Sequence, residues 1–550
     1  MSDDSSQPPL LESDPFEAVV DQYLSAQCAY SPGSATYFGI HDHDMVLAEP
    51  GEAAAEAWAR SLEAVLDDVR RLPPTADPRR QVDRRALAGL CTSTLIDVAE
   101  VQPWRRNPVS HLEELLWSFY VPIVRPYAPA EDRAVAVRAR LSQVPEFLDR
   151  ARAVIDDVPD VFAETALEMG AAIRSLLAGT IPEWGRQEAP GVPLASAAAA
   201  ADAALDDHLA WLAAEHRGGR GSFAIGGERF ERKVASAHAL PLTTEQLVSI
   251  GEELFDRTRE EMEAVARRLG RGWTDEVEAA KADHPSASAL LDAYRAEAER
   301  ALEFTSSHRL VALPEAALEV LATPEPVRTL IPYAAYVAPG ALEKDTTGVF
   351  WVTPPDDTLS PAEAAERLRG HNRAAITVTT VHEAYPGHHL QLATAKQFPS
   401  VLGRLEASPL LIEGWAFYCE ELAWEHGYYD DRTRLLQLKD QLWRAIRVVV
   451  DAKLHTGEMS VADAERALVD RAGLDQVAAR AEVRRYAMMP TYATAYAMGK
   501  AAILDLRDDA RTALGPRFDL RVFHDELLSY GSVPVPLVAD VLASSWRRES

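Results

Sequence analysis

Apolar residues recur at spacings of three and four along most of the chain, which places them on one face of a helix. Residues 51–71 illustrate the pattern, because Ala54, Trp58, Leu62 and Val65 form one stripe. Alanine, leucine, glutamate and arginine are abundant in such segments, and all four favour helices. The same pattern predicts further helices over residues 131–155, 159–178, 193–216, 243–270, 286–305 and 361–375.

Strand-like segments are few. Thr347–Thr353 combines β-branched and aromatic residues and is followed by two prolines, so it predicts a short strand. Ser222–Ile225 is a weaker candidate. We find no fixed-period repeat and no long linker rich in glycine, serine or proline. The sequence therefore predicts a mainly α protein with a small β element, in which residues 1–14 form a disordered tail and residues 15–550 form a single helical domain.

The composition limits the class of protein and of partner. The 550 residues are 47% hydrophobic and 26% charged, which excludes a mostly disordered chain. The formal net charge is −29 and no long basic block interrupts it, so we expect neither nucleic acid nor an anionic membrane as a partner. Three cysteines without metal-ligand spacing exclude a disulfide framework.

The predicted location follows from two sequence features. The first residues lack the basic start and apolar run of a signal peptide. No stretch of about 18 apolar residues, the length needed to span a membrane, occurs in the chain. We therefore expect a cytoplasmic protein.

The most informative segment lies at residues 379–391. Three histidines and one glutamate fall within eight residues, namely His382, Glu383, His388 and His389. Histidine and glutamate are zinc ligands, and a glutamate beside a ligating histidine can act as a general base. The usual signature, H-E-x-x-H, places both histidines on one helix face. This sequence departs from it, because the fourth residue after His382 is Pro386.

Geometry restricts how this cluster could bind a metal. On a straight helix, His389 would lie ~10 Å along the axis from His382, and His388 would face away. Pro386 and Gly387 can interrupt the helix, and the two-residue insertion then makes His388 the second ligand. His389 is the alternative ligand, or a residue that supports the ligands or faces the substrate. A histidine-rich helix end without a metal is the competing interpretation.

A third ligand is expected from the next helix. Glu413 lies 25 residues after His388 in an otherwise apolar turn, where a carboxylate needs a partner. Glu420 lies two turns further along the same face and could orient a ligating histidine. A solvated helix face is the alternative interpretation of Glu420.

Further polar residues follow later in the chain. Arg447, Asp451 and His455 recur every four residues and share a helix face, a pattern that alone favours a salt-bridged helix surface. A basic group such as Arg447 or Arg484 could also bind a substrate carboxylate. The residues of this region that we expect to support the ligands or to bind the substrate are Arg447, His455, Arg484 and Tyr486.

Two tyrosines complete the candidate site. Tyr492 and Tyr496 are four residues apart and share a helix face. A phenol can donate a hydrogen bond to a developing oxyanion, so either residue could act in catalysis. Two tyrosines in a protein core would give the same pattern.

Together, these motifs resemble those of the bacterial domain-of-unknown-function 885 family. The matching segments are TVHEAYPGHHLQ, IEGWAFYCEEL, RVVVDAKLH and EVRRY with the tyrosines that follow it. Near the amino terminus, SATYFGIHDHD at residues 34–44 is similar to the first signature of that family. The resemblance therefore spans nearly the whole chain.

This family looks like a distant relative of the helical zinc peptidases typified by thimet oligopeptidase and the thermostable carboxypeptidases. The resemblance implies a two-lobed helical shell around a deep cleft. It matches His382, His388 and Glu413 to zinc ligands, Glu383 to the base, Tyr492 or Tyr496 to the tyrosine pair and Thr347–Thr353 to a substrate-pairing edge strand. The chain departs from the family at residues 490–493, which read PTYA where the family usually has PGQA.

The leading hypothesis is a metallopeptidase-like, zinc-dependent hydrolase of amide bonds in short peptides, with Glu383 as general base. Mn, Co, Ni and Fe accept the same ligands as zinc. One alternative is a metalloenzyme of a biosynthetic pathway that acts on one small amide or catalyses a non-hydrolytic step. A second alternative is a non-catalytic helical binding protein.

Overall fold

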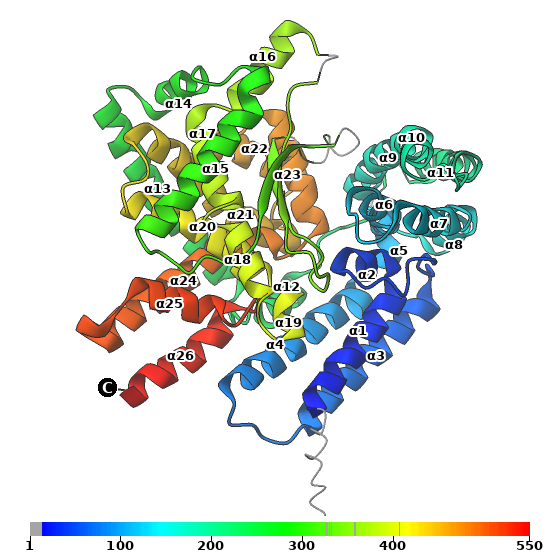
Figure 1. Ribbon diagram of the computed structural model, residues 1–550, viewed down its shortest axis with the longest axis horizontal. Coiled ribbons are helices and arrows are strands. Elements are labelled where there is room, and N and C mark those ends of the chain that lie inside the picture. The colour runs from blue at the N-terminus through cyan, green and yellow to red at the C-terminus, as the bar shows by residue number, and fades with distance from the viewer. Residues whose placement is uncertain are drawn as a thin grey trace, which may run out of the picture.

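The structure is a computed structural model that describes residues 14–549, apart from residues 217, 220, 325–327, 329–330, 332, 357–358 and 406–407. It is mainly helical with one small sheet, which confirms the predicted fold class (Figure 1). The predicted tail at residues 1–14 lies outside the described residues except for Asp14. The Asp14 side chain accepts a hydrogen bond from the Phe16 N–H at 2.9 Å and caps the first helix.

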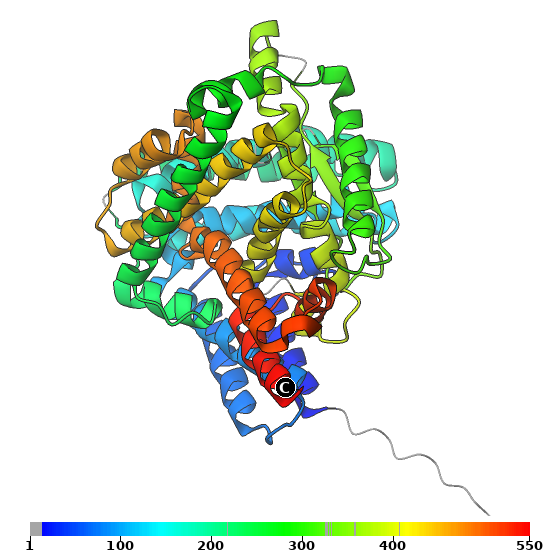
Figure 2. The same cartoon turned by 90° about the vertical axis from the view of Figure 1, so that its left-hand side faces the viewer.

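The amino-terminal helices form one group around aromatic contacts. Trp58 lies between the rings of Tyr23 and Tyr30, each 5.8 Å away between centroids. The carboxyl-terminal helix α26 (Val535–Glu549) packs beside α4, so the two ends of the described chain share this region (Figures 1 and 2). The group comprises α1 (Pro15–Tyr30), α2 (Pro32–Phe38), α3 (Glu52–Arg71), α4 (Pro78–Leu95), a π-helical segment (Ile96–Val101) and α5 (Pro103–Arg106).

A second group of helices has its own apolar core, on the right of Figure 1. The helix predicted over residues 131–155 is two helices, because the chain turns at Ser142 and Gln143. The group comprises α6 (Pro108–Val124), α7 (Ala130–Leu141), α8 (Val144–Val154), α9 (Asp160–Ser175), a π-helical segment (Leu176–Thr180), α10 (Ile181–Glu188) and α11 (Ala195–Glu215).

The remaining helices surround the sheet and the histidine motif. Helices α13 (Thr244–Leu269) and α21 (Asp431–Thr456) pack along each other. The predicted helix over residues 361–375 is interrupted at His371 and Asn372, where Asn372 caps a new helix. The other helices are α12 (Gly227–Ala237), α14 (Trp273–Lys281), α15 (Leu290–Ser307), α16 (Pro361–Gly370), α17 (Arg373–Glu383), α18 (His388–Ala395), α19 (Val401–Arg404), α20 (Pro409–Glu425), α22 (Val461–Ala472), α23 (Gln476–Met488), α24 (Tyr492–Leu514) and α25 (Leu520–Leu528), with 3-10 turns at Ala287–Ala289 and Gly515–Arg517.

The sheet has the strand order β1-β3-β2. Strand β3 (Gly348–Val352) pairs in parallel with β1 (Leu318–Ala322) and antiparallel with β2 (Ala334–Val337). The strand predicted near residue 350 is therefore present, but it is the central strand, and the expectation that it forms the edge is wrong. The edge nearest the histidine motif is β2. The candidate strand at Ser222–Ile225 is also wrong, because these residues join no sheet.

Candidate metal centre

The histidine motif is divided between two short helices. Helix α17 carries His382 and Glu383 in its last turn, and α18 begins at His388. Pro386 and Gly387 lie in the break between them. A Cβ atom at residue 387 would overlap the carbonyl oxygens of His382 and Val381, so only glycine permits this close return of the chain. The break brings His388 back beside His382.

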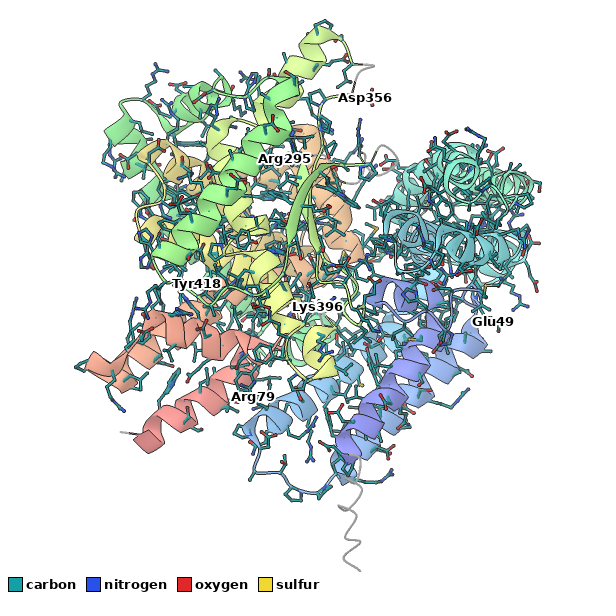
Figure 3. The ribbon with its side chains drawn as sticks, in the orientation of Figure 1. Glu49, Arg79, Arg295, Asp356, Lys396 and Tyr418 are labelled. Atoms are coloured by element: carbon teal, nitrogen blue, oxygen red, sulfur yellow. The ribbon has the colours of Figure 1, made fainter. Side chains whose placement is uncertain are left out.

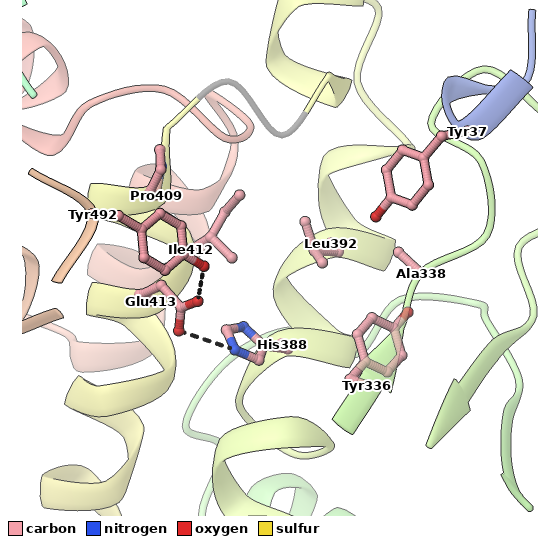
Figure 4. A pocket seen from close by; sticks show the side chains of 9 residues that line it. All are labelled: Tyr37, Tyr336, Ala338, His388, Leu392, Pro409, Ile412, Glu413 and Tyr492. Carbon is pink, nitrogen blue, oxygen red and sulfur yellow. Dashed lines mark hydrogen bonds and ion pairs between the residues drawn. The ribbon is translucent and has the colours of Figure 1, made fainter. Parts of the chain in front are cut away.

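Three side chains meet at this break. His382, His388 and Glu413 each offer one donor atom, and these atoms lie within 4.8 Å of one another. Figure 4 shows two of the three side chains, His388 and Glu413, facing each other. Glu413 Oε2 is 3.6 Å from His382 Nε2 and 3.5 Å from His388 Nε2. Ligands at ~2 Å from a tetrahedral zinc ion stand roughly 3.3 Å apart. The two measured distances are close to this value, so the three side chains could hold a metal ion with little rearrangement. All three residues are buried.

The charges around His382 favour a cation at this position. Its Nδ1 lies 2.9 Å from Glu420 Oε1, which leaves Nε2 directed towards Glu413. Burial alone would lower the pKa of His382, but the carboxylates of Glu413 and Glu420 raise it to about 9. The pKa of Glu413 is held well below its ordinary value, because His382 and His388 outweigh the effect of burial. Two buried carboxylates thus surround a site that stabilises positive charge.

Tyr492 fixes the orientation of Glu413. The phenol donates a hydrogen bond to Glu413 Oε1 at 2.6 Å, which leaves the other oxygen facing the histidines. The contact depends on a close approach of α20 and α24, which two glycines permit. A Cβ atom at Gly499 would overlap the Leu410 carbonyl oxygen, and a Cβ atom at Gly414 would lie 2.5 Å from the Gly499 Cα. Burial and Glu413 raise the pKa of Tyr492 well above its ordinary value, so the phenol remains a donor.

Glu383 faces the edge of the sheet. The side chain is partly exposed, unlike that of His382. Its Oε2 accepts a hydrogen bond from the Tyr336 N–H of β2 at 2.9 Å. Tyr336 also lines the pocket that contains His388, so Glu383 contacts a residue of the pocket wall. Glu383 thus follows the candidate ligand His382 in the chain and is held at the strand residue that borders the pocket.

His389 lies away from the three donor atoms. Its Nδ1 is 3.2 Å from the Tyr336 hydroxyl, and its ring meets Tyr385 edge-on. Burial lowers the pKa of His389 to about 4, so the ring is neutral. The structure thus groups His388, and not His389, with His382 and Glu413.

The other expected site residues lie around α21, α23 and α24. Arg447 donates to the Tyr486 hydroxyl at 2.7 Å and to Glu482 at 2.9 Å, and it stacks on the ring of Tyr496. His455 Nε2 lies 2.9 Å from the Tyr486 carbonyl oxygen. Arg447 and His455 are buried, so the interpretation of a salt-bridged surface is wrong for this helix face.

Arg484 of α23 links the helices that surround the sheet to the second group of helices. Its guanidinium donates to Glu164 and, at 2.7 Å, to Glu168, both on α9. Arg484 and Arg447 are therefore each engaged by carboxylates of the chain itself, and neither lines the pocket.

Asp451 caps α24 from the neighbouring helix. It is 0% exposed and accepts hydrogen bonds from the Thr491 N–H at 3.3 Å and from the N–H and hydroxyl of Thr494 at 3.1 and 2.9 Å. Thr491 has a left-handed backbone, with φ of 75°, and offers α24 no side-chain cap of its own. Asp451 therefore positions the first turn of α24, which carries Tyr492.

We expect Asp451 to give the stability a characteristic pH dependence. Burial raises its pKa from 3.8 to about 7, because the effect of burial exceeds that of the hydrogen bonds from Thr494 and Thr491, which lower the pKa. A pKa that is raised on folding stabilises the folded state at low pH, and this contribution disappears as the pH rises to the folded pKa. Between about pH 4 and 7, the unfolding free energy of the wild type should fall relative to Asp451→Asn by up to roughly 4 kcal/mol. Urea unfolding of both proteins across this range measures the effect, and a pH-independent difference would contradict it.

Comparisons with known proteins give a family but no activity. A family model described as "Bacterial protein of unknown function (DUF885)" matches residues 32–542. A solved structure described as a "putative lipoprotein of unknown function" from Shewanella oneidensis is 25% identical with a TM-score of 0.80, over 96% of this chain and 99% of that one. A "putative lipoprotein" from Colwellia psychrerythraea is 18% identical with a TM-score of 0.83, over 97% and 100%. No curated protein matches the chain.

These neighbours contradict the predicted cytoplasmic location. Both are described as lipoproteins, a class held at a membrane by attached lipid. The prediction rested on the absence of an apolar span and of a leader pattern, and a lipid anchor requires no spanning helix. No helix within the described ranges is long and apolar enough to cross a membrane.

Proposed function

We propose that this chain, which belongs to the bacterial DUF885 family, is a metal-dependent hydrolase of amide bonds in short peptides. The observation that carries the proposal is the convergence of His382, His388 and Glu413, with Glu383 adjacent to His382 in the chain. Two imidazoles and one carboxylate, with a further position left for water, are the ligand set of many zinc hydrolases. Zinc is the metal we favour, although other divalent transition metals accept these ligands.

The residues have separate roles in the proposed reaction. A bound zinc ion would supply Lewis acidity and lower the pKa of water towards ~7. His382, His388 and Glu413 would hold it, while Glu420 orients His382 and Tyr492 orients Glu413.

Glu383 would move the proton that hydrolysis requires. Its carboxylate would take a proton from the attacking water and deliver it to the nitrogen of the leaving amine. The Tyr336 N–H holds Oε2, so Oε1 is the oxygen left for this exchange.

Tyr492 and Tyr496 are the candidate donors to the oxyanion. Their ring centroids are 5.9 Å apart, and both belong to α24. Tyr492 lines the pocket, whereas Tyr496 is buried behind it over Arg447. We therefore assign the role to Tyr492, whose single O–H would turn from Glu413 Oε1 to the oxyanion during the reaction.

The size of the site supports a short substrate. The ligands are buried, and the pocket beside them has a volume of about 240 Å³. Such a space accommodates one side chain of a peptide and excludes the surface of a folded protein.

Metal content and hydrolysis together test the proposal. Mass spectrometry of purified, dialysed protein should give close to one zinc per chain, as a three-ligand site predicts. The same protein should hydrolyse members of a dipeptide and tripeptide library, and chelation should stop it. Bound metal without turnover of any peptide would favour an enzyme with one small amide substrate. Absence of metal after reconstitution would favour a binding protein.

A further inference from the structure

The pocket beside the candidate ligands has a polar end and walls of aromatic and aliphatic side chains, three of which are tyrosines with a polar hydroxyl. His388 and Glu413 form the polar end (Figure 4). Its other lining residues are aromatic or aliphatic: Tyr37, Tyr336, Ala338, Leu392, Pro409, Ile412 and Tyr492. The volume of about 240 Å³ exceeds the ~150 Å³ of an apolar cavity that holds benzene. The pocket therefore has room for a phenyl group directly next to the reacting bond.

Tyr37 reaches this pocket from the far end of the sequence. It belongs to α2 and to the segment at residues 34–44 that the proposed catalysis leaves without a role. Arg125 holds both walls of the pocket, since its guanidinium donates to the Tyr37 carbonyl oxygen at 2.5 Å and to that of Ala338 at 3.0 Å. The same guanidinium stacks 4.7 Å from the centroid of the Tyr37 ring.

Further contacts fix α2 to the loop that follows β2. The Leu342 N–H donates to the Phe38 carbonyl oxygen at 2.8 Å. Lys396, labelled in Figure 3, donates to the Gly340 carbonyl oxygen of this loop at 2.8 Å. Asp44 accepts from the Thr36 hydroxyl at 2.6 Å and closes the turn after α2. These contacts hold the Tyr37 ring at the pocket, and none of the residues that make them is a candidate metal ligand.

A second aromatic residue supports Tyr37. The Trp117 ring of α6 meets it edge-on, with centroids 5.3 Å apart, and Trp117 itself is 37% exposed. Aromatic rings prefer such edge-on contacts, and exposed aromatic faces are typical of sites that bind apolar ligands.

We propose that this pocket binds an aromatic side chain of the substrate, and that Tyr37 is a specificity-determining residue. The inference rests on the proposed hydrolase function and adds to it the class of peptide. The side chain would insert between Tyr37 and Ile412, with the amide at the His388 and Glu413 end.

Kinetics on two peptide series test the inference. In Ala-X and X-Ala peptides, kcat/KM should rise from X = Gly to X = Phe by at least roughly tenfold in one series. Tyr37→Ala should remove most of this gain while changing the Gly peptide much less. Tyr37→Phe, which keeps the ring, should retain the Phe-to-Gly ratio. Ala338→Leu, which narrows the pocket, should lower kcat/KM for Phe more than for Gly. Equal losses for Phe and Gly peptides would overturn the proposal.

A binding measurement separates this proposal from the proposed function. Glu383→Gln protein should bind the Phe peptide more tightly than the Gly peptide by calorimetry, and Tyr37→Ala in that background should abolish the difference. If the wild type hydrolyses nothing but this preference is observed, the hydrolase proposal fails and the pocket proposal stands. Hydrolysis without any dependence on Tyr37 would overturn the pocket proposal and leave the hydrolase proposal intact.

Discussion

Glu383→Gln is expected to lower kcat/KM for a peptide substrate by roughly 10³-fold, the usual contribution of a positioned general base. The side-chain amide of the variant cannot take a proton from water, whereas its oxygen can still accept the hydrogen bond from the Tyr336 N–H. The structure around the site should therefore persist. Initial rates with a Phe-containing dipeptide, measured alongside metal content, separate the loss of the base from the loss of the metal.

Glu366→Gln provides a matched control for this substitution. Glu366 lies on α16, is 75% exposed in its side chain and pairs with Arg369 at 3.1 Å. Its replacement should change kcat/KM by less than about twofold, as is usual for a surface site. If Glu383→Gln retains metal and at least half of the wild-type activity, Glu383 is not the base.

His382→Ala should remove the metal from the protein. Loss of one of three ligands leaves only His388 and Glu413, too few for a stable zinc site. The substitution also removes the imidazole that lies between two buried carboxylates, at 3.6 Å from Glu413 and 2.9 Å from Glu420. Glu420 keeps Arg444 at 3.2 Å and Glu413 keeps His388 at 3.5 Å, but each buried carboxylate loses one partner. The metal-free variant should therefore unfold at a lower temperature than the metal-free wild type.

His389→Gln is the matched control for metal content. His389 is buried and lies on the same helix as His388, but it is hydrogen-bonded to the Tyr336 hydroxyl at 3.2 Å and not to the ligand group. We expect this variant to keep its metal per folded chain. Metal lost from His389→Gln and kept by His382→Ala would reverse the assignment of the ligands.

Local sequence patterns predict most helices because each helix needs only its own apolar stripe. The helix at residues 51–71 is α3, Glu52–Arg71, almost to the residue. The break within residues 361–375 has a local signal, because Gly370 ends one helix and Asn372 caps the next, but apolar spacing alone overlooks it. The edge position of a strand depends on its neighbours, so Thr347–Thr353 by itself could not reveal that β2 covers it.

The candidate ligands were predictable because they are close in sequence and chemically distinctive. His382, His388 and Glu413 lie within 32 positions, and the Pro-Gly break indicates how the first two meet. Tyr37 could not be predicted, since its place in the pocket depends on Arg125 and Ala338, which are distant in sequence. Asp451 was visible as part of a polar face, but periodicity cannot distinguish a solvated face from one buried against another helix.

The contact between α2 and the loop after β2 has an evolutionary consequence. The three candidate ligands and Glu383 come from residues 382–413, whereas one wall of the pocket comes from residue 37. Mutations near the amino terminus can therefore alter which peptides are accepted while the reactive centre stays intact. The range of substrates could thus diverge through mutations in the first part of the gene, while the part that encodes the candidate ligands and Glu383 stays unchanged.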